Sequence, residues 1–154
     1  MKSYDIVALG GTFDIIHNGH IELLNKAFSI SHKTIIGLTS DELAIRKGKD
    51  LVKNYEQRLA SLKSVIEKNF PKSSYEVSKL ENDFGPAVIE GNVQALVVSK
   101  ETRNKGLLLN ELRAKRNLPS VEIVVIPMVL AEDGNPISTT RIKNSEIDNK
   151  GNLN

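Results

Sequence analysis

The chain has 154 residues, 40% of them hydrophobic and 26% charged, with a net charge of +2 and no cysteine. A chain this long buries roughly 68 to 70% of its unfolded surface as one domain, and no apolar run approaches the roughly 18 residues that cross a bilayer. We therefore expect a single domain over 1–154 in the cytoplasm, without disulfides, thiolate zinc sites, cysteine nucleophiles or a general affinity for nucleic acids or membranes.

Short apolar runs alternate with amphipathic segments along the chain, which is the pattern of βαβ units. Strands are predicted at 5–9, 34–38, 75–80, 95–99 and 121–126. Three helices are predicted between them from apolar residues at helical spacing. These residues are Ile21, Leu24 and Phe28, then Tyr55, Leu59, Leu62 and Ile66, and then Leu108 and Leu112. Asn54 and Gln57 form a capping box at the start of the second helix.

These elements predict the fold class: an α/β, doubly wound, Rossmann-like domain with a five-stranded, mostly parallel sheet between helices. The alternating strand at 75–80 is expected nearer an edge, and the polar tail at 144–154 is expected to fray. Such sheets bind ligands beyond the carboxyl ends of their strands. Function is therefore predicted in the loops 10–20, 39–54, 100–106 and the segment from 127 to 141.

The first of these loops, 10–20, contains two glycines followed by two histidines (GGTFDIIHNGH). Gly10 and Gly11 allow a tight turn and close approach to a ligand, and the next helix start offers free N–H groups there. His17 and His20 lie three residues apart, so both rings can face one oxygen-rich ligand. The loop is predicted to bind phosphate, although it matches neither a P-loop nor a full dinucleotide fingerprint. An ordinary turn or a metal site is the alternative, but a third ligand of suitable spacing is missing.

The 10–20 stretch resembles the signature of the nucleotidyltransferase superfamily, in which a His-x-Gly-His element binds the triphosphate of ATP or CTP. The resemblance implies that His20 supports the α-phosphate that is transferred. It further implies that this loop binds ATP through Gly10, Gly11, Thr12, Phe13 and His17.

A second motif, 137–143 (ISTTRIK), follows the last predicted strand. Ser138 is a good N-cap, and Arg141 occupies the position where a capping box would have an acidic or amide side chain, so the helix start is electropositive. Such a start suits the leaving phosphates of a nucleotide, unless the segment is only a capped helix. It resembles the superfamily's second signature, Ile-Ser-Ser-Thr-x-x-Arg, with Lys143 in place of the arginine. The expected ATP ligands here are Ser138, Thr139, Thr140 and Arg141.

Further segments, at 39–47, 80–87, 98–102 and 127–134, resemble archaeal-type phosphopantetheine adenylyltransferase over about 5–148 of the chain. The Ser-x-Glu-Thr at 99–102 and the Asn-x-x-Arg at 110–113 are also similar to eukaryotic CoA synthase. The resemblance implies adenylyl transfer from ATP to 4′-phosphopantetheine with Mg²⁺, giving dephospho-CoA and pyrophosphate, a late step of coenzyme A biosynthesis.

An acceptor that is already an ionised phosphate needs no general base, so catalysis reduces to positioning and neutralising charge. His20 and Lys47 are the expected catalytic residues, with Lys47 bridging the acceptor phosphate and Lys49 as its rival. Asp14 either faces the acceptor or orients its loop, and the structural role is favoured. No protein ligand for the metal is assigned. The expected substrate-binding residues are Thr12, Asp14, Lys47, Ser99, Glu101 and Arg113.

The nearest alternative is a cytidylyltransferase that makes a CDP-alcohol, because those enzymes share the first signature. The middle and late segments favour the adenylyltransferase. A regulatory nucleotide-binding module without turnover is a second alternative, but it would need neither both histidines nor the leaving-group segment. A nucleic-acid role is disfavoured, because none of the aromatic residues, 4 Phe and 3 Tyr, is interleaved with the basic stretches.

Overall fold

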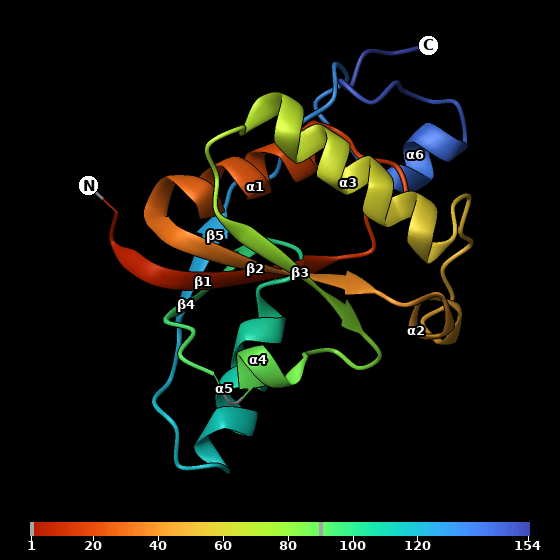
Figure 1. Ribbon diagram of the computed structural model, residues 1–154. Helices are drawn as coiled ribbons and strands as arrows, with labels where there is room; N and C mark the ends of the chain where they lie inside the picture. The colour runs from red at the N-terminus through yellow and green to blue at the C-terminus, as the bar shows by residue number, and fades with distance from the viewer. Residues whose placement is uncertain (1, 90) are drawn as a thin grey trace.

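Five parallel strands form one sheet in the order β3-β2-β1-β4-β5 in the computed structural model, which describes residues 2–89 and 91–154 (Figure 1). The strands are β1 (Tyr4–Gly11), β2 (Ser31–Thr39), β3 (Tyr75–Leu80), β4 (Ala95–Ser99) and β5 (Glu122–Ile126). The helices are α1 (Asn18–Ile30), α2 (Asp41–Arg46), α3 (Tyr55–Asn69), α4 (Pro86–Ile89), α5 (Asn104–Ala114) and α6 (Thr139–Lys143). The expected doubly wound α/β class is confirmed, and the sheet is parallel throughout.

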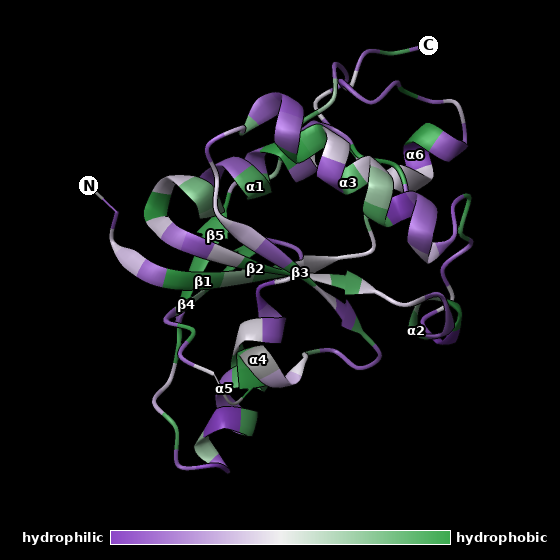
Figure 2. Ribbon diagram, viewed as in Figure 1, coloured by the Kyte–Doolittle hydropathy of each residue, from purple (hydrophilic) through white to green (hydrophobic). Residues whose placement is uncertain are grey.

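Helices cover both faces of the sheet, with α1 and α3 on one face and α4 and α5 on the other (Figure 1). The larger core packs Leu24 and Phe28 of α1 and Leu62 of α3 against the sheet. The opposite core packs Val88 of α4 and Leu109 of α5 against it. The central strands are accordingly apolar, whereas the helices are apolar on one side and polar on the other (Figure 2). This burial on both faces explains the nearly continuous apolar runs of the strands.

Most predicted elements are found within a few residues of the expected bounds, and β3 lies at an edge of the sheet as predicted. The predicted core face of α5 is wrong. Leu109 is fully buried, whereas Leu108 is 38% exposed. Because the small residue Gly106 lies against Ile123 of β5, the helix presents the face of 106, 109 and 113 to the sheet.

The tail at 144–154, which was expected to fray, packs against the rest of the domain. Ile147 is 1% exposed and forms a small third core with Ala131 and Ile137. Hydrogen bonds hold this segment to the 130–136 loop and to α1, where the Asn18 N–H donates to the Asn149 carbonyl at 3.1 Å. The buried Ile147 and the hydrogen-bonded backbone hold the segment in place despite its polar composition.

The strand order reverses direction between β1 and β4, since the chain first builds outward through β2 and β3 and then returns. Doubly wound sheets bind ligands at such a switch point, beyond the carboxyl ends of the strands. Within residues 2–89 and 91–154, no helix is long and apolar enough to cross a membrane.

Candidate active site

A cleft of about 750 Å³ opens at the carboxyl ends of the strands and is lined by all four loops in which function was predicted. A volume in this range holds a small-molecule ligand. The loop after β3 adds Phe84 to its wall. The predicted site residues that line the cleft are Gly10, Gly11, Thr12, Phe13, Asp14, His17, His20, Lys47, Ser99, Glu101, Ser138, Thr139 and Thr140.

The two histidines stack on each other at the start of α1, with ring centroids 3.9 Å apart and ring planes at 29°. His17 is the N-cap, and its Nδ1 accepts from the Gly19 N–H at 3.0 Å. The Nδ1 of His20 accepts from the His17 N–H at 3.2 Å. Because both Nδ1 atoms are acceptors, each neutral ring carries its proton on Nε2. Each ring is therefore able to donate one hydrogen bond from Nε2 to an oxygen of a ligand.

Burial keeps both rings neutral. It lowers the pKa of His17 to about 4. For His20, burial and then the charge of His17 lower the pKa to about 3. At neutral pH the pair contributes hydrogen-bond donors to the cleft and no net charge.

The glycine between the histidines has a steric role. A Cβ on Gly19 would lie 2.7 Å from Cε1 and 2.9 Å from Nδ1 of His17. Real Cβ atoms do not approach so closely, so any side chain at this position would displace the capping ring.

The expectation of free N–H groups at the start of α1 is wrong. The N–H of Asn18 donates to the Asn149 carbonyl, that of Gly19 to the His17 ring, and that of His20 to the His17 carbonyl. The first turn is thus satisfied by the chain itself. The backbone reversal before the helix also falls on Phe13, with a φ of 51°, and not on Gly10 or Gly11, which end β1.

Asp14 is 3% exposed and joins three segments. Its carboxylate accepts from the N–H groups of Val52 and Lys53, both at 2.9 Å, and pairs with Lys143 at 2.7 Å. Burial would raise the pKa of Asp14, but the hydrogen bonds from Lys143 and the two backbone groups prevail and lower it. These contacts favour the structural role over direct contact with an acceptor. Lys143, which also donates to the Asp50 carbonyl, lines the cleft and lies on α6.

A cluster of lysines lines the other side of the cleft. Lys47 forms an ion pair with Asp83, and Lys49 lines the cleft beside it. Lys105, in the first turn of α5, completes the cluster. Its pKa is lowered first by burial and then by the charge of Lys47. Among the described residues that line the cleft, four lysines (Lys47, Lys49, Lys105 and Lys143) outnumber three acidic residues (Asp14, Asp50 and Glu101), so the lining has a net positive charge that suits an anion.

Arg141, one of the predicted ATP ligands, is not among the residues that line the cleft. The guanidinium forms ion pairs with Asp133 and Glu146 and donates to the carbonyl of Pro136 at 3.1 Å. The predicted N-cap is present, since the Ser138 hydroxyl accepts from the Arg141 N–H at 3.2 Å. The helix α6 has only five residues, and three of them, Thr139, Thr140 and Lys143, line the cleft.

Arg113, one of the predicted substrate-binding residues, lies outside the cleft lining. It is 3% exposed, and its guanidinium donates to the carbonyls of Val88, Gly91 and Pro119. These bonds fasten α4 and the following turn to α5. Ser99 and Glu101 do line the cleft, where the Ser99 hydroxyl lies 3.1 Å from that of Thr102.

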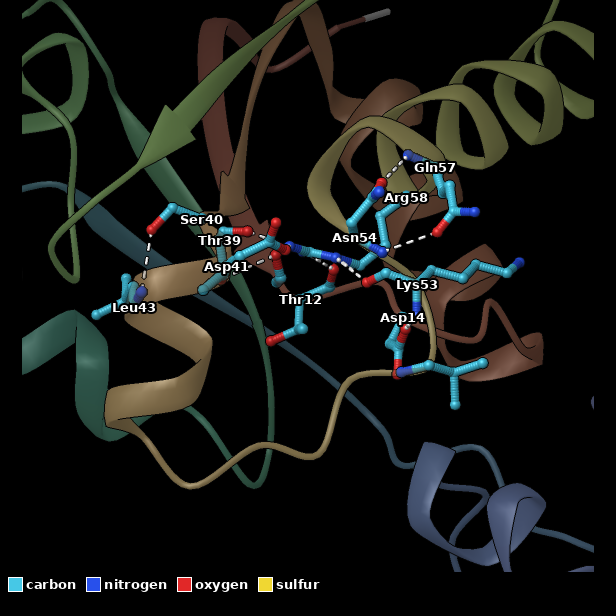
Figure 3. A network of polar contacts seen from close by, with 12 residues as sticks. Thr12, Asp14, Thr39, Ser40, Asp41, Leu43, Lys53, Asn54, Gln57 and Arg58 are labelled. Carbon is cyan, nitrogen blue, oxygen red and sulfur yellow. Dashed lines mark hydrogen bonds and ion pairs between the residues drawn. The ribbon is translucent and has the colours of Figure 1, made fainter.

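Arg58 is the functional candidate that the sequence reasoning missed. It is 0% exposed, and its guanidinium reaches the carbonyls of Thr12 and Thr39 and the carboxylate of Asp41 (Figure 3). A signal was present, because Arg58 precedes the buried Leu62 by four residues and so lies on the apolar face of α3. Lys105 could also have been noticed in the sequence, because a lysine in the first turn of a helix is unfavourable beside the positive end of the helix dipole and needs an anionic partner.

Comparison with known proteins agrees with this geometry. A family model described as cytidylyltransferase-like matches residues 8–145. A phosphopantetheine adenylyltransferase from Methanosarcina acetivorans is 44% identical over 96% of this chain and 94% of its own length. One from Methanothermobacter thermautotrophicus is 38% identical over 99% of this chain and 91% of its own. The solved structure of a protein of unknown function from Archaeoglobus fulgidus superposes with a TM-score of 0.71 at 31% identity, over 82% of this chain and 89% of that one.

The fold, the cleft and the match over most of the chain define a nucleotidyltransferase of the cytidylyltransferase-like class. The full-length relatives make the assignment narrower. The chain belongs to the phosphopantetheine adenylyltransferase family. The predicted family is thereby confirmed, and the cytidylyltransferase and non-enzymatic alternatives are the less supported ones.

Proposed function

We propose that this chain transfers the adenylyl group of ATP to 4′-phosphopantetheine, giving dephospho-CoA and pyrophosphate. The observation that carries the proposal is that neutral histidine donors, hydroxyl groups and a lysine cluster all line one cleft in a chain of this family. Together they offer separate places for the transferred phosphate, the leaving phosphates and the phosphate of the acceptor.

In the proposed reaction an oxygen of the acceptor phosphate attacks the α-phosphorus of ATP. The new P–O bond forms as the bond to the β-phosphate breaks, and the electron pair leaves on pyrophosphate. The Nε2–H of His20 donates to the α-phosphate as its charge shifts, and the hydroxyls of Ser138, Thr139 and Thr140 hold the leaving group. Lys47 exchanges Asp83 for the acceptor phosphate, with Lys49 as the rival and Lys105 adding charge.

Mg²⁺ is proposed to enter with ATP, bound to its phosphates. Among the described residues no group of three His, Asp or Glu side chains is arranged to hold a metal. The carboxylates of Asp14, which lines the cleft, and of Asp83, beside the cleft residue Lys47, are each paired with a lysine. A phosphate-bound ion would neutralise charge on the leaving group.

A pyrophosphate-release assay tests the activity. ATP or CTP is paired with 4′-phosphopantetheine, glycerol 3-phosphate, phosphocholine or nicotinamide mononucleotide, with and without Mg²⁺. We expect release only with ATP, 4′-phosphopantetheine and Mg²⁺ together. Comparable pyrophosphate release from CTP and a phospho-alcohol would mean that the chain is a cytidylyltransferase.

The direct displacement has its own test. With ATP made chiral at the α-phosphorus by sulfur substitution, one in-line transfer inverts the configuration. Retention would require two transfers through a protein nucleophile, and His20 would be the first candidate.

A further inference from the structure

Arg58 lies in the first turn of α3, entirely inside the protein, and joins three segments beside the cleft. Its Nη1 donates to the Thr12 carbonyl, in the loop after β1, and to the Thr39 carbonyl, at the end of β2, both at 2.8 Å. Its Nε donates to the Lys53 carbonyl at 3.2 Å, and Asp41 neutralises its charge at 2.7 Å (Figure 3). A planar guanidinium is the side chain that can satisfy several acceptors in fixed directions at once.

The bond to Thr12 fixes the direction of a whole peptide group. A trans peptide is planar, so its carbonyl and its N–H point in opposite directions. Because Arg58 holds the Thr12 carbonyl on the α3 side, the N–H of Phe13 is directed away from α3. That N–H donates to no backbone carbonyl of the described residues. Phe13 is among the residues that line the cleft, and the residue as a whole is 1% exposed.

Phe13 needs such support because of its conformation. Its φ of 51° is unfavourable for an aromatic residue and persists only where neighbouring structure holds it. Its ring packs against that of His20, with centroids 4.9 Å apart. A change in the Thr12–Phe13 peptide would therefore move the His20 ring as well. The Thr39 hydroxyl adds a further tie to the Gly11 carbonyl at 3.1 Å.

We propose that Arg58 is a positioning residue for the transfer reaction: by holding the Thr12 carbonyl, it aims the Phe13 N–H and the His20 ring at the phosphates of the nucleotide. The identity of the nucleotide rests on the proposed function, whereas the orientation of the peptide does not. Arg58 acts through these two groups and does not itself touch the substrates.

Replacing Arg58 by lysine keeps the charge beside Asp41 but removes the planar fork. Arg113→Lys is the matched control, because Arg113 is equally buried and also binds backbone carbonyls, but outside the cleft. Both variants should have a lower Tm. At a temperature well below both values, we expect kcat to fall by about 10²-fold in Arg58→Lys only, the size of effect that a misplacement of about 1 Å can cause. Equal kcat in both variants would overturn the proposal.

A rescue experiment separates positioning from folding. Added guanidinium ion at a non-denaturing concentration should restore part of the kcat of Arg58→Ala, while the same concentration of KCl should not. Rescue by KCl to the same extent would show that the guanidinium group is not required.

A titration of the unmodified protein tests whether the Phe13 N–H faces the phosphates, and it can be done even if the Arg58 variants do not fold. Inorganic pyrophosphate is added while the backbone amide resonances are followed by NMR. We expect the Phe13 amide to shift together with those of Ser138 and Thr139. A Phe13 amide that stays unchanged while the others shift would overturn the proposal. A Phe13 shift in a protein that does not turn over 4′-phosphopantetheine would support Arg58 positioning and count against the proposed substrate.

Discussion

His20 combines three properties that a donor to a developing charge requires: a fixed ring, a defined proton and a partly buried position. The His17 N–H fixes Nδ1, the Phe13 and His17 rings hold the plane, and burial keeps the ring neutral. We expect His20→Ala to lower kcat by about 10² to 10³, the effect of removing one preorganised donor, and to change ATP affinity less. Steady-state kinetics and calorimetric ATP binding check this. Loss of ATP affinity with unchanged kcat would make His20 a ground-state ligand.

The same two histidines should make stability depend on pH. In the unfolded chain their pKa is 6.5, whereas in the folded protein it is about 4 for His17 and about 3 for His20. The unfolded state therefore takes up protons first as the pH falls. Stability from the neutral rings is complete above pH 6.5 and is lost as the pH falls toward the folded values. Denaturant melts from pH 7 to pH 4 should show a steeper decline for the natural protein than for a His17→Asn, His20→Asn double variant. Parallel curves would contradict the burial effect.

Lys143 and Arg141 allow a comparison between two cations of one helix. Lys143 lines the cleft, whereas Arg141 is engaged by Asp133 and Glu146. We expect Lys143→Ala to weaken pyrophosphate binding about 10- to 100-fold, because a hydrogen bond to a charged group contributes about 1.5 to 3 kcal/mol. Arg141→Ala should lower Tm and leave the affinity nearly unchanged. Calorimetry with both variants tests this, and a larger loss with Arg141→Ala would reinstate its predicted role as an ATP ligand.

At the scale of elements, the C-terminal segment contributes to stability in a way that its polar composition did not predict. Ile147 is almost fully buried in a small core with Ala131 and Ile137. Ile147→Ala should cost about 2 kcal/mol, the lower end for a buried isoleucine, because a core this small can collapse around the gap. Hydrogen exchange should show the loss in the 130–136 loop and α6. Ile45→Ala, at a 67% exposed position, is the control and should melt like the natural protein. Unchanged exchange in Ile147→Ala would mean that the segment does not stabilise this region.

The elements also show what the spacing of apolar residues can and cannot predict. Apolar runs predicted the five strands, because strands buried on both faces of a sheet are apolar along their length. Apolar residues at helical spacing predicted the long helices. Arg58 was missed and Leu108 was wrongly placed in the core for one reason: a helix has several adjacent rows of side chains, and only the packed neighbours decide which row is buried. The signatures at 10–20 and 137–143 located the cleft correctly. They could not indicate that the Asn149 carbonyl satisfies α1, because that partner is distant in the sequence. Nor could they indicate that Asp133 and Glu146 engage Arg141, because only the fold of the loops on either side of α6 brings these side chains together.

At the scale of the molecule, the cleft draws its wall from loops after all five strands, so a bound nucleotide should stabilise the whole fold. ATP at 100 times its Kd should raise the free energy of unfolding by about 2.7 kcal/mol, as linkage requires for a ligand that binds only the folded state. Thermal melts with ATP, CTP and no nucleotide at equal Mg²⁺ check this. We expect the larger shift in Tm with ATP. An equal shift in Tm with CTP would mean that the protein does not select the base when the nucleotide binds.

The bond between Asn18 and the Asn149 carbonyl has a consequence for synthesis. Strands β1 to β5 all leave the ribosome before residue 149, which is added while synthesis continues at about 5 to 20 residues per second. The sheet can therefore assemble while the first turn of α1, beside His17 and His20, still lacks its last hydrogen-bond partner. Nucleotide should bind the growing chain at full strength only after that late carbonyl has docked, so incomplete translation products would not sequester ATP.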